Sequence, residues 1–173
     1  MFKIINEDLN AYTCNGGLLK KIKWVMFNHT IHMGILFRLS STLLHFPILG
    51  RLLAKIIEYL IRVLYASDIS SKAKIKGGLV FTHGHDIVIG ADVSLGKNCT
   101  IFNGVTLGNK DLKSSSVGNQ PTLGDNVTLS TGVKVLGPLT IGDNVVVGAN
   151  SVVIKNLPSD CIAVGVPVKI IKK

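Results

Sequence analysis

The chain has 173 residues, of which 47% are hydrophobic and 17% charged, so one folded domain with a small appendage is expected and a disordered linker is excluded. The 19 Lys and Arg against 10 Asp and Glu leave a net charge of +9, but this charge is spread along the chain. Because no zinc-finger spacing or aromatic RNA-binding motif accompanies it, no nucleic-acid partner is expected. Cys14, Cys99 and Cys161 form no CxxC pair, which favours a reducing, cytoplasmic location.

Residues 1–66 predict an N-terminal helical region. Apolar residues recur there at three- and four-residue spacing within 18–26, 35–46 and 52–64, which is typical of amphipathic helices with their polar sides outward. The favoured interpretation is a helical cap packed on the domain that follows. We predict no membrane-spanning helix, because no apolar run is long enough, and no cleavable signal sequence.

A second interpretation of this region stays open. Lys20, Lys21 and Lys23 lie beside Trp24, and a basic amphipathic surface of this kind can rest on an anionic membrane. The alternative location is therefore peripheral, at the inner face of the membrane.

Residues 67–173 change to a period of six. An aliphatic or aromatic residue begins each of thirteen hexads, a small or β-branched residue often follows four positions later, and Gly directly follows six of the starts. The starts are Ile69, Ile75, Phe81, Ile89, Leu95, Ile101, Leu107, Leu123, Leu129, Val135, Ile141, Val147 and Val153. A hexad supplies one short strand and one turn, so three hexads close a triangular coil. We therefore predict a mainly β protein, a left-handed parallel β-helix of about four coils, with the helical region at its N-terminus.

Two breaks in this period mark loops that leave the prism. The interval from Leu107 to Leu123 is 16 residues, and the polar segment 109–121 within it predicts a projecting loop. The shorter break follows Phe81 and contains two histidines and an aspartate. Loops on a rigid solenoid are common places for functional sites.

The motifs of this half resemble those of the hexapeptide-repeat acetyltransferases, serine acetyltransferase branch. The resemblance covers residues 68–170. Asp68–Ile75 reads DISSKAKI and is similar to that branch's DIHPAAKI; further similar segments are 77–84, VTLG at 105–108, GANSVV at 148–153 and GVP at 165–167.

The resemblance implies acetyl transfer from acetyl-CoA to a hydroxyl, with no metal. His83 matches the family's catalytic histidine and Asp68 its supporting aspartate, while Asp86 is a rival for that supporting role. The chemistry suits these residue types. An imidazole can take the hydroxyl proton near neutral pH, and a carboxylate can fix the ring's orientation.

The resemblance also implies a homotrimer with acetyl-CoA at the subunit interfaces. The residues expected to contact the donor are Thr106, Gly108, Asn109, Thr131, Gly132, Ala149 and Lys169. The small residues would let the pantetheine arm approach the backbone, and Lys169 would meet its phosphates.

The acceptor-binding candidates depart from the family pattern. They are Thr82, His85, Asp86, Asn119 and Gln120. Serine acetyltransferases carry an Arg-His pair where this chain has Asn119 and Gln120, and an Asp where it has Thr82, so the charged partners of a zwitterion are missing. The HG at 83–84 and the VTLGN at 105–109 also resemble acetyltransferases of colanic-acid and other surface-polysaccharide pathways. Departure and resemblance together favour a hydroxyl of a sugar or surface-polysaccharide precursor, with an oligosaccharide or other small molecule as acceptor.

Other readings stay open or are set aside. Serine O-acetylation is the alternative activity, and a non-catalytic scaffold on the same fold is a further one. The family's tail that docks into cysteine synthase has no counterpart here, so no such partner is expected. A zinc site of three histidines is not expected, because no His follows His85.

Overall fold

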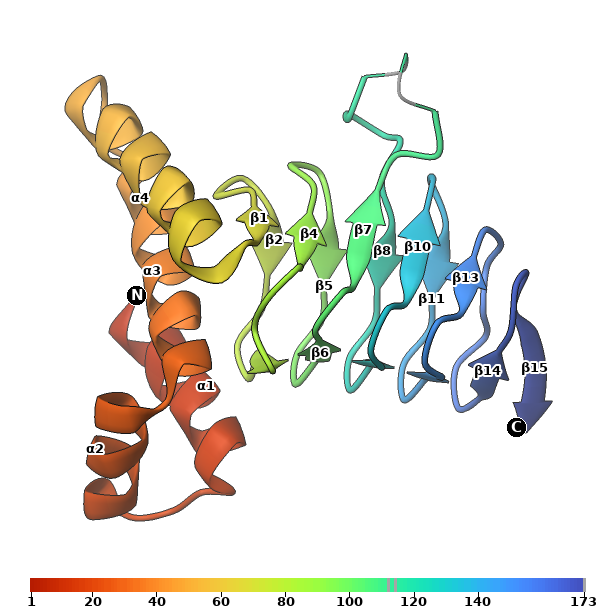
Figure 1. The fold of residues 1–173 in the computed structure, drawn as a ribbon, viewed down its shortest axis with the longest axis horizontal. Coiled ribbons are helices and arrows are strands. Elements are labelled where there is room, and N and C mark those ends of the chain that lie inside the picture. Colours follow the sequence, from red (N-terminus) through yellow and green to blue (C-terminus); the bar gives the residue numbers. More distant parts are fainter. Residues whose placement is uncertain (112, 114, 173) are drawn as a thin grey trace.

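The computed structural model describes residues 1–111, 113 and 115–172. Four α-helices precede the strands and gather at one end of the molecule (Figure 1). They are α1 (Phe2–Thr13), α2 (Leu18–Phe27), α3 (His29–Leu43) and α4 (Leu49–Tyr65). Asn28 caps α3 by accepting a hydrogen bond from the Thr30 N–H at 2.9 Å, which is the usual role of an N-cap asparagine.

The described strands form three faces of a prism. The first face has β1 (Asp68–Ile69), β4 (Val88–Ile89), β7 (Thr106–Gly108), β10 (Lys134–Leu136) and β13 (Val152–Val153). The second has β2 (Lys74–Ile75), β5 (Ser94–Leu95), β8 (Thr122–Leu123) and β11 (Thr140–Ile141). The third has β3 (Val80–Thr82), β6 (Thr100–Phe102), β9 (Thr128–Leu129), β12 (Val146–Val147), β14 (Ile162–Val164) and the antiparallel β15 (Lys169–Lys172).

The predicted β-helix is confirmed. Every hexad start is buried, and successive coils pair in parallel register, for example Ile89 beside Leu107. The described strands stack in five coils, whereas about four were predicted. The fifth was missed because its inward residues Val153, Leu157 and Ala163 are spaced by four and then six residues.

One edge of the prism is held by a ladder of side-chain amides. Asn98, Asn126 and Asn144 each occupy the left-handed region, with φ between 55° and 57°. Asn98 Nδ2 donates to Asn126 Oδ1 at 3.2 Å, and Asn126 Nδ2 donates to Asn144 Oδ1 at 2.9 Å. Asn tolerates this backbone region better than most residues, so the same residue both turns the chain and joins the coils.

The helices differ from the prediction in what they expose. Large apolar side chains of α2 and α4 face solvent, although their polar sides were predicted to do so. Only one side of α4 packs against the protein, through residues such as Ala54 and Ile61. Helix α1 lies inside the predicted helical region 1–66, although none of the periodic segments covered it.

A buried ion pair joins α1 and α3 to the first coil. Arg38 Nε donates to Asp8 Oδ2 at 2.9 Å, and its guanidinium also donates to the Ile75 and Lys76 carbonyls at 2.5 and 2.7 Å. Asp8 Oδ1 accepts from the Leu79 N–H at 2.9 Å. Burial raises the pKa of Asp8, against the opposing effect of Arg38. This network fixes the helices on the end of the prism.

The predicted loop at 109–121 projects from the prism after β7 (Figure 1). Its positions 112 and 114 lie outside the described residues. Among the described helices, none combines the length and the apolar character needed to cross a bilayer.

Candidate active site

His83 lies at a corner of the first coil, between β3 and β4. Its φ is 56°, an uncommon value for a residue other than Gly, and its carbonyl accepts a hydrogen bond from the His85 N–H at 2.6 Å. This tight turn puts the imidazole outside the prism, where it is exposed and 6.5 Å from the Phe102 ring. His83 is therefore available to a ligand.

A cavity of about 390 Å³ opens beside His83, between the helices and β3. Sequence reasoning placed Thr82 and His83 here but missed the helical residues that complete the wall. The lining is Ala11, Tyr12, Trp24, Phe27, Asn28, His29, Thr30, Val80, Phe81, Thr82 and His83. The cap formed by Asn28 was a usable signal for where α3 begins, but no pattern in the sequence indicated that α1 and α2 would meet β3.

Tyr12 supports this wall because its hydroxyl forms the backbone hydrogen bonds that a neighbouring strand would otherwise form with Phe81. Its hydroxyl donates to the Phe81 carbonyl at 3.0 Å and accepts from the Phe81 N–H at 2.7 Å. Phe81 belongs to the outermost strand of its face, so both of its backbone groups would otherwise lack a ladder partner. Burial raises the pKa of Tyr12 to about 12, which keeps the hydroxyl neutral.

The two aspartates proposed to orient His83 have different surroundings. Asp68 Oδ1 is 2.8 Å from Arg62 Nη2, in an exposed ion pair between α4 and β1. Asp86 is exposed on the same turn as His83, with φ 54°, and its Oδ2 is 3.7 Å from where a Cβ on Gly104 would lie. His85 is exposed too, and its carbonyl accepts from the Gly104 N–H at 3.2 Å. The corner thus gathers two histidines and a carboxylate.

Asn119 and Gln120 lie at the other end of the first face from the corner of His83, in the projecting loop. Gln120 Nε2 donates to Asn109 Oδ1 at 2.8 Å, and Gln120 Oε1 accepts from the Asp92 N–H at 2.8 Å. Asn119 Nδ2 donates to the Ser115 carbonyl at 3.0 Å. These amides hold the base of the loop together. The residue types at 119 and 120 therefore depend on how the loop packs, and not on a bound ligand alone.

Of the residues proposed for the donor, Thr106, Thr131 and Gly132 lie at the same corner of the prism as His83, whereas Gly108 and Asn109 lie at the end of β7 next to the projecting loop. Thr106 and Gly108 begin and end β7, and a Cβ added to Gly108 would meet no atom within 4 Å, so the surface there is open. Gly132 differs, because a Cβ on it would approach Asn150 Oδ1 to 2.2 Å. Gly132 also has a φ of 75°, so a side chain at this position would be strained.

Other donor candidates lie further along. Thr131 Oγ1 donates to Asn103 Oδ1 at 3.1 Å, Ala149 is next to the stacking residue Asn150, and Lys169 is exposed on β15. Sequence reasoning missed Lys134, whose Nζ donates to the Gly104 carbonyl at 2.6 Å and the Thr106 hydroxyl at 3.0 Å. The Lys134 ammonium therefore places a positive charge beside Thr106, one of the residues proposed to bind the donor.

No cluster of three or more His, Cys, Asp or Glu side chains suited to a metal occurs within the described parts of the chain. His29 stacks against Tyr65, and His32 contacts the Val25 carbonyl.

Family models match both halves of the β-helix. The model described as bacterial transferase hexapeptide (six repeats) matches residues 120–155, and that of the hexapeptide repeat of succinyl-transferase matches 86–110. A serine acetyltransferase of Helicobacter pylori is 40% identical over 121 residues, which are 70% of this chain and 70% of the relative. A serine acetyltransferase of Synechococcus elongatus is 41% identical over 125 residues, 72% of this chain and 49% of that protein. The chain spans about half the length of several such relatives.

Solved structures agree over almost the whole chain. A serine acetyltransferase of Neisseria gonorrhoeae has a TM-score of 0.87 at 28% identity and covers 99% of this chain and 66% of its own. One from Brucella abortus, solved with coenzyme A, has a TM-score of 0.89 at 24% identity, covering 99% and 68%, which shows the shared fold.

These relatives correct two expectations. The preference for a sugar or polysaccharide acceptor is wrong, since the curated relatives and solved structures that match are serine acetyltransferases. The residues at 119 and 120 misled because they also serve the loop's own hydrogen bonds. The expected lack of a cysteine synthase partner conflicts with the same homology and is not retained. The chain belongs to the serine acetyltransferase family of hexapeptide-repeat transferases.

Proposed function

We propose that this protein transfers the acetyl group of acetyl-CoA to the hydroxyl of serine. The observation that carries the proposal is the 40% identity to a serine acetyltransferase over 70% of both chains. The exposed His83 beside a cavity supports it, because that arrangement can hold a small hydroxyl acceptor against a base.

His83 acts as the general base in this proposal. Its imidazole accepts the serine hydroxyl proton while the oxygen attacks the thioester carbonyl carbon, which gives a tetrahedral oxyanion. Collapse of this intermediate breaks the carbon–sulfur bond. The CoA thiolate takes the proton from the imidazolium, and O-acetylserine and CoA leave. The proton and the electron pair are balanced without a metal.

Asp68 is the proposed orienting residue, following the family motif, and Asp86 is the alternative. The Asp68 ion pair with Arg62 is exposed, and such pairs contribute little energy, so the carboxylate is free to exchange partners. Comparing Asp68→Asn with Asp86→Asn separates the two. The variant that loses more kcat, with unchanged melting temperature, identifies the residue that positions the ring.

The proposed donor strip runs from Thr106 along the corner past Thr131, Gly132 and Ala149 toward Lys169. Along β7, Thr106 is next to the corner of His83 and Gly108 next to the projecting loop. One chain therefore does not bring the loop residues to His83. A homotrimer in which one copy's loop meets the next copy's corner would do so, and a monomeric mass by light scattering would refute this assembly.

The activity is tested by CoA release from acetyl-CoA with and without serine. His83→Ala should lower kcat by about 10²–10⁴, with folding retained because the side chain lies outside the prism. His45→Ala is the matched control: it removes an exposed histidine that does not line the cavity of His83, and it should keep full activity. No serine-dependent CoA release from the folded protein would refute the proposal.

A further inference from the structure

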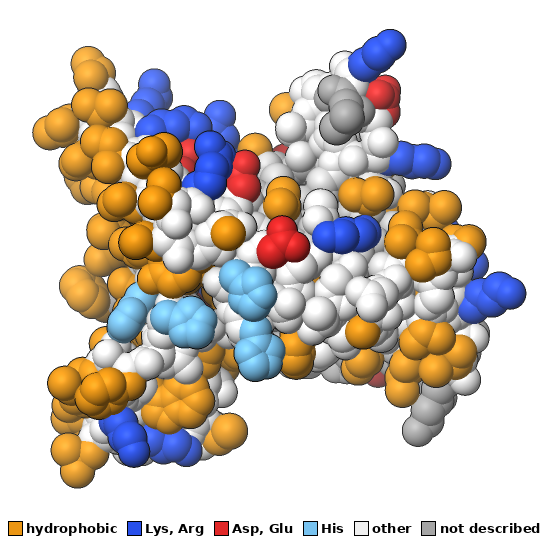
Figure 2. Space-filling model, viewed as in Figure 1, with side chains coloured by type: hydrophobic (Ala, Val, Ile, Leu, Met, Phe, Trp, Pro, Cys, Tyr) orange, Lys and Arg blue, Asp and Glu red, His pale blue; other side chains and the backbone are white. Residues whose placement is uncertain are grey.

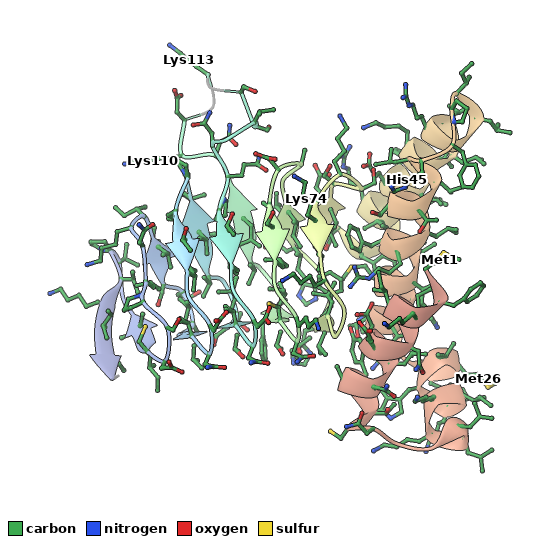
Figure 3. All side chains as sticks on the ribbon, turned by 180° about the vertical axis from the view of Figure 1, so that it is seen from behind. Met1, Met26, His45, Lys74, Lys110 and Lys113 are labelled. Atoms are coloured by element: carbon green, nitrogen blue, oxygen red, sulfur yellow. The ribbon has the colours of Figure 1, made fainter. Side chains whose placement is uncertain are left out.

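Helix α2 packs on α1 and α3 along one side and leaves its other side exposed. None of its ten residues is buried. Leu18, Leu19, Met26 and Phe27 are 73%, 84%, 64% and 77% exposed, and Ile22 is 46% exposed. Met26 points away from the strands in Figure 3, and Figure 2 shows hydrophobic side chains gathered over the helical end. Large apolar side chains in such numbers normally mark a contact surface.

The charges of α2 are all positive. Lys20, Lys21 and Lys23 lie among these apolar residues, and the helix contains no carboxylate. Lys20 Nζ donates to the Thr13 carbonyl at 2.8 Å and Lys21 Nζ to Asn6 Oδ1 at 2.9 Å. Both partners are neutral, so the two positive charges remain uncompensated.

The three carboxylates of the helical region face the β-helix instead. Asp8 is buried against Arg38, and Glu58 Oε1 accepts from the Ser71 N–H at 2.7 Å. Glu7 lies against the Gly77 turn, where an added Cβ would come within 1.8 Å of its Oε2. The fold thus separates charge, with the acids turned toward the strands and the lysines on α2, of which Lys20 and Lys23 are exposed.

We propose that α2 docks on the surface of an anionic lipid bilayer. A helix with exposed leucine and aromatic side chains and with lysines beside them lies in the interface, where apolar groups enter the acyl boundary and the ammonium groups meet anionic headgroups. A second copy of the chain suits the surface less well, because pairing two α2 helices would bring six lysines together.

The larger apolar stripe of α4 does not share this charge pattern. Its Lys55 is 3.0 Å from Glu58, and its Arg62 is paired with Asp68. Two of the cations beside that stripe are therefore neutralised, and the proposal is confined to α2. It does not depend on the acceptor of the acetyl group.

Trp24, the only tryptophan of the sequence, lies in α2 and is half-buried beside Tyr12, so its fluorescence reports changes in the surroundings of this helix. Its fluorescence is followed while vesicles of phosphatidylcholine, or of an equal mixture with phosphatidylglycerol, are added to the full chain. We expect a blue shift with the anionic vesicles and little change with the neutral ones.

Two sets of variants test which features carry docking. Lys20→Glu, Lys21→Glu and Lys23→Glu together should weaken binding to the anionic vesicles about a hundredfold. Lys72→Glu, Lys97→Glu and Lys155→Glu change the net charge equally on exposed parts of the β-helix and should leave most of the affinity. Leu19→Ser with Ile22→Ser should also weaken binding, and should fold because neither side chain is buried.

Three results would overturn the proposal. The first is the absence of any blue shift with anionic vesicles. The second is equal loss of affinity in the two lysine variants, which would mean that net charge alone is responsible. The third is a lower solution mass of the Leu19→Ser, Ile22→Ser variant without lipid, which would identify α2 as a contact between copies.

Discussion

The β-helix and the helical region bury their apolar residues in different ways. In the β-helix each coil covers the next, and every hexad start is buried with residues such as Ile101 and Leu107 at 0% exposure. In the helical region, α2 and α4 leave leucines exposed by more than half, including Leu19 and Leu52. A repeat closes its own core because each unit supplies the surface that its neighbour needs. Helices without a repeat depend on whatever surface they meet.

Breaking the buried ion pair between the helical region and the β-helix should lower the free energy of unfolding more than any other change considered below. Asp8→Asn leaves the buried Arg38 without its anionic partner, and removing one member of a buried pair costs about 3–5 kcal/mol. Urea unfolding followed by circular dichroism measures the loss of unfolding free energy. Arg62→Gln, which breaks the exposed pair with Asp68, is the control and should cost less than about 1 kcal/mol. Equal losses in both variants would show that the buried pair does not couple the regions.

The contrast in burial predicts unequal truncation costs. Ile101→Ala removes a fully buried side chain from the middle of the β-helix and should lower the unfolding free energy by about 2–5 kcal/mol. Leu60→Ala, on the exposed stripe of α4, should change it by less than about 0.5 kcal/mol. Thermal denaturation of the two variants tests this. A large loss for Leu60→Ala would mean that the stripe is covered in solution.

The Tyr12 hydroxyl, at the boundary between the helices and the β-helix, should make a smaller, pH-dependent contribution to the free energy of unfolding. Its pKa rises from 10 to about 12 on folding, so the native state holds the proton more tightly than the unfolded chain. The resulting stability is fully present below pH 10 and is lost as the pH rises through about 12. Tyr12→Phe should lose about 1 kcal/mol at neutral pH, because two backbone groups of Phe81 lose their partner. Its stability should then fall less than that of the natural chain between these pH values, as measured by urea unfolding.

The β-helix was predictable because its information is local and repeated. Thirteen starts in one period located the buried residues Ile69 to Val153, and the interval between Leu107 and Leu123 located the loop. The fifth coil broke the period, since Leu157 follows Val153 by only four residues. Spacing therefore predicts a solenoid well until its last coil, where a neighbour is no longer needed on both sides.

The cavity beside His83 was less accessible from the sequence. Three helices contribute to its wall, through Tyr12, Trp24 and His29. These helices are far from β3 in the sequence, so no local pattern indicates that they meet it. The acceptor was wrongly predicted for a related reason. Gln120 was interpreted as a ligand contact, while its amide lies in hydrogen bonds to Asn109 and Asp92. Residue type alone does not separate a binding amide from one that holds a loop.

The two ends of the β-helix are closed by different devices. At the first coil the Tyr12 hydroxyl forms hydrogen bonds with the backbone of Phe81 on the edge strand β3. At the last coil the antiparallel β15 pairs with β14. Every coil between them meets a neighbour of the same shape. Insertion of three further hexads between these ends would lengthen the prism by about 4.8 Å and would leave both closures unchanged. The number of coils can therefore change during evolution, because the structures that close the two ends do not depend on it. The corner that carries His83 would stay as it is.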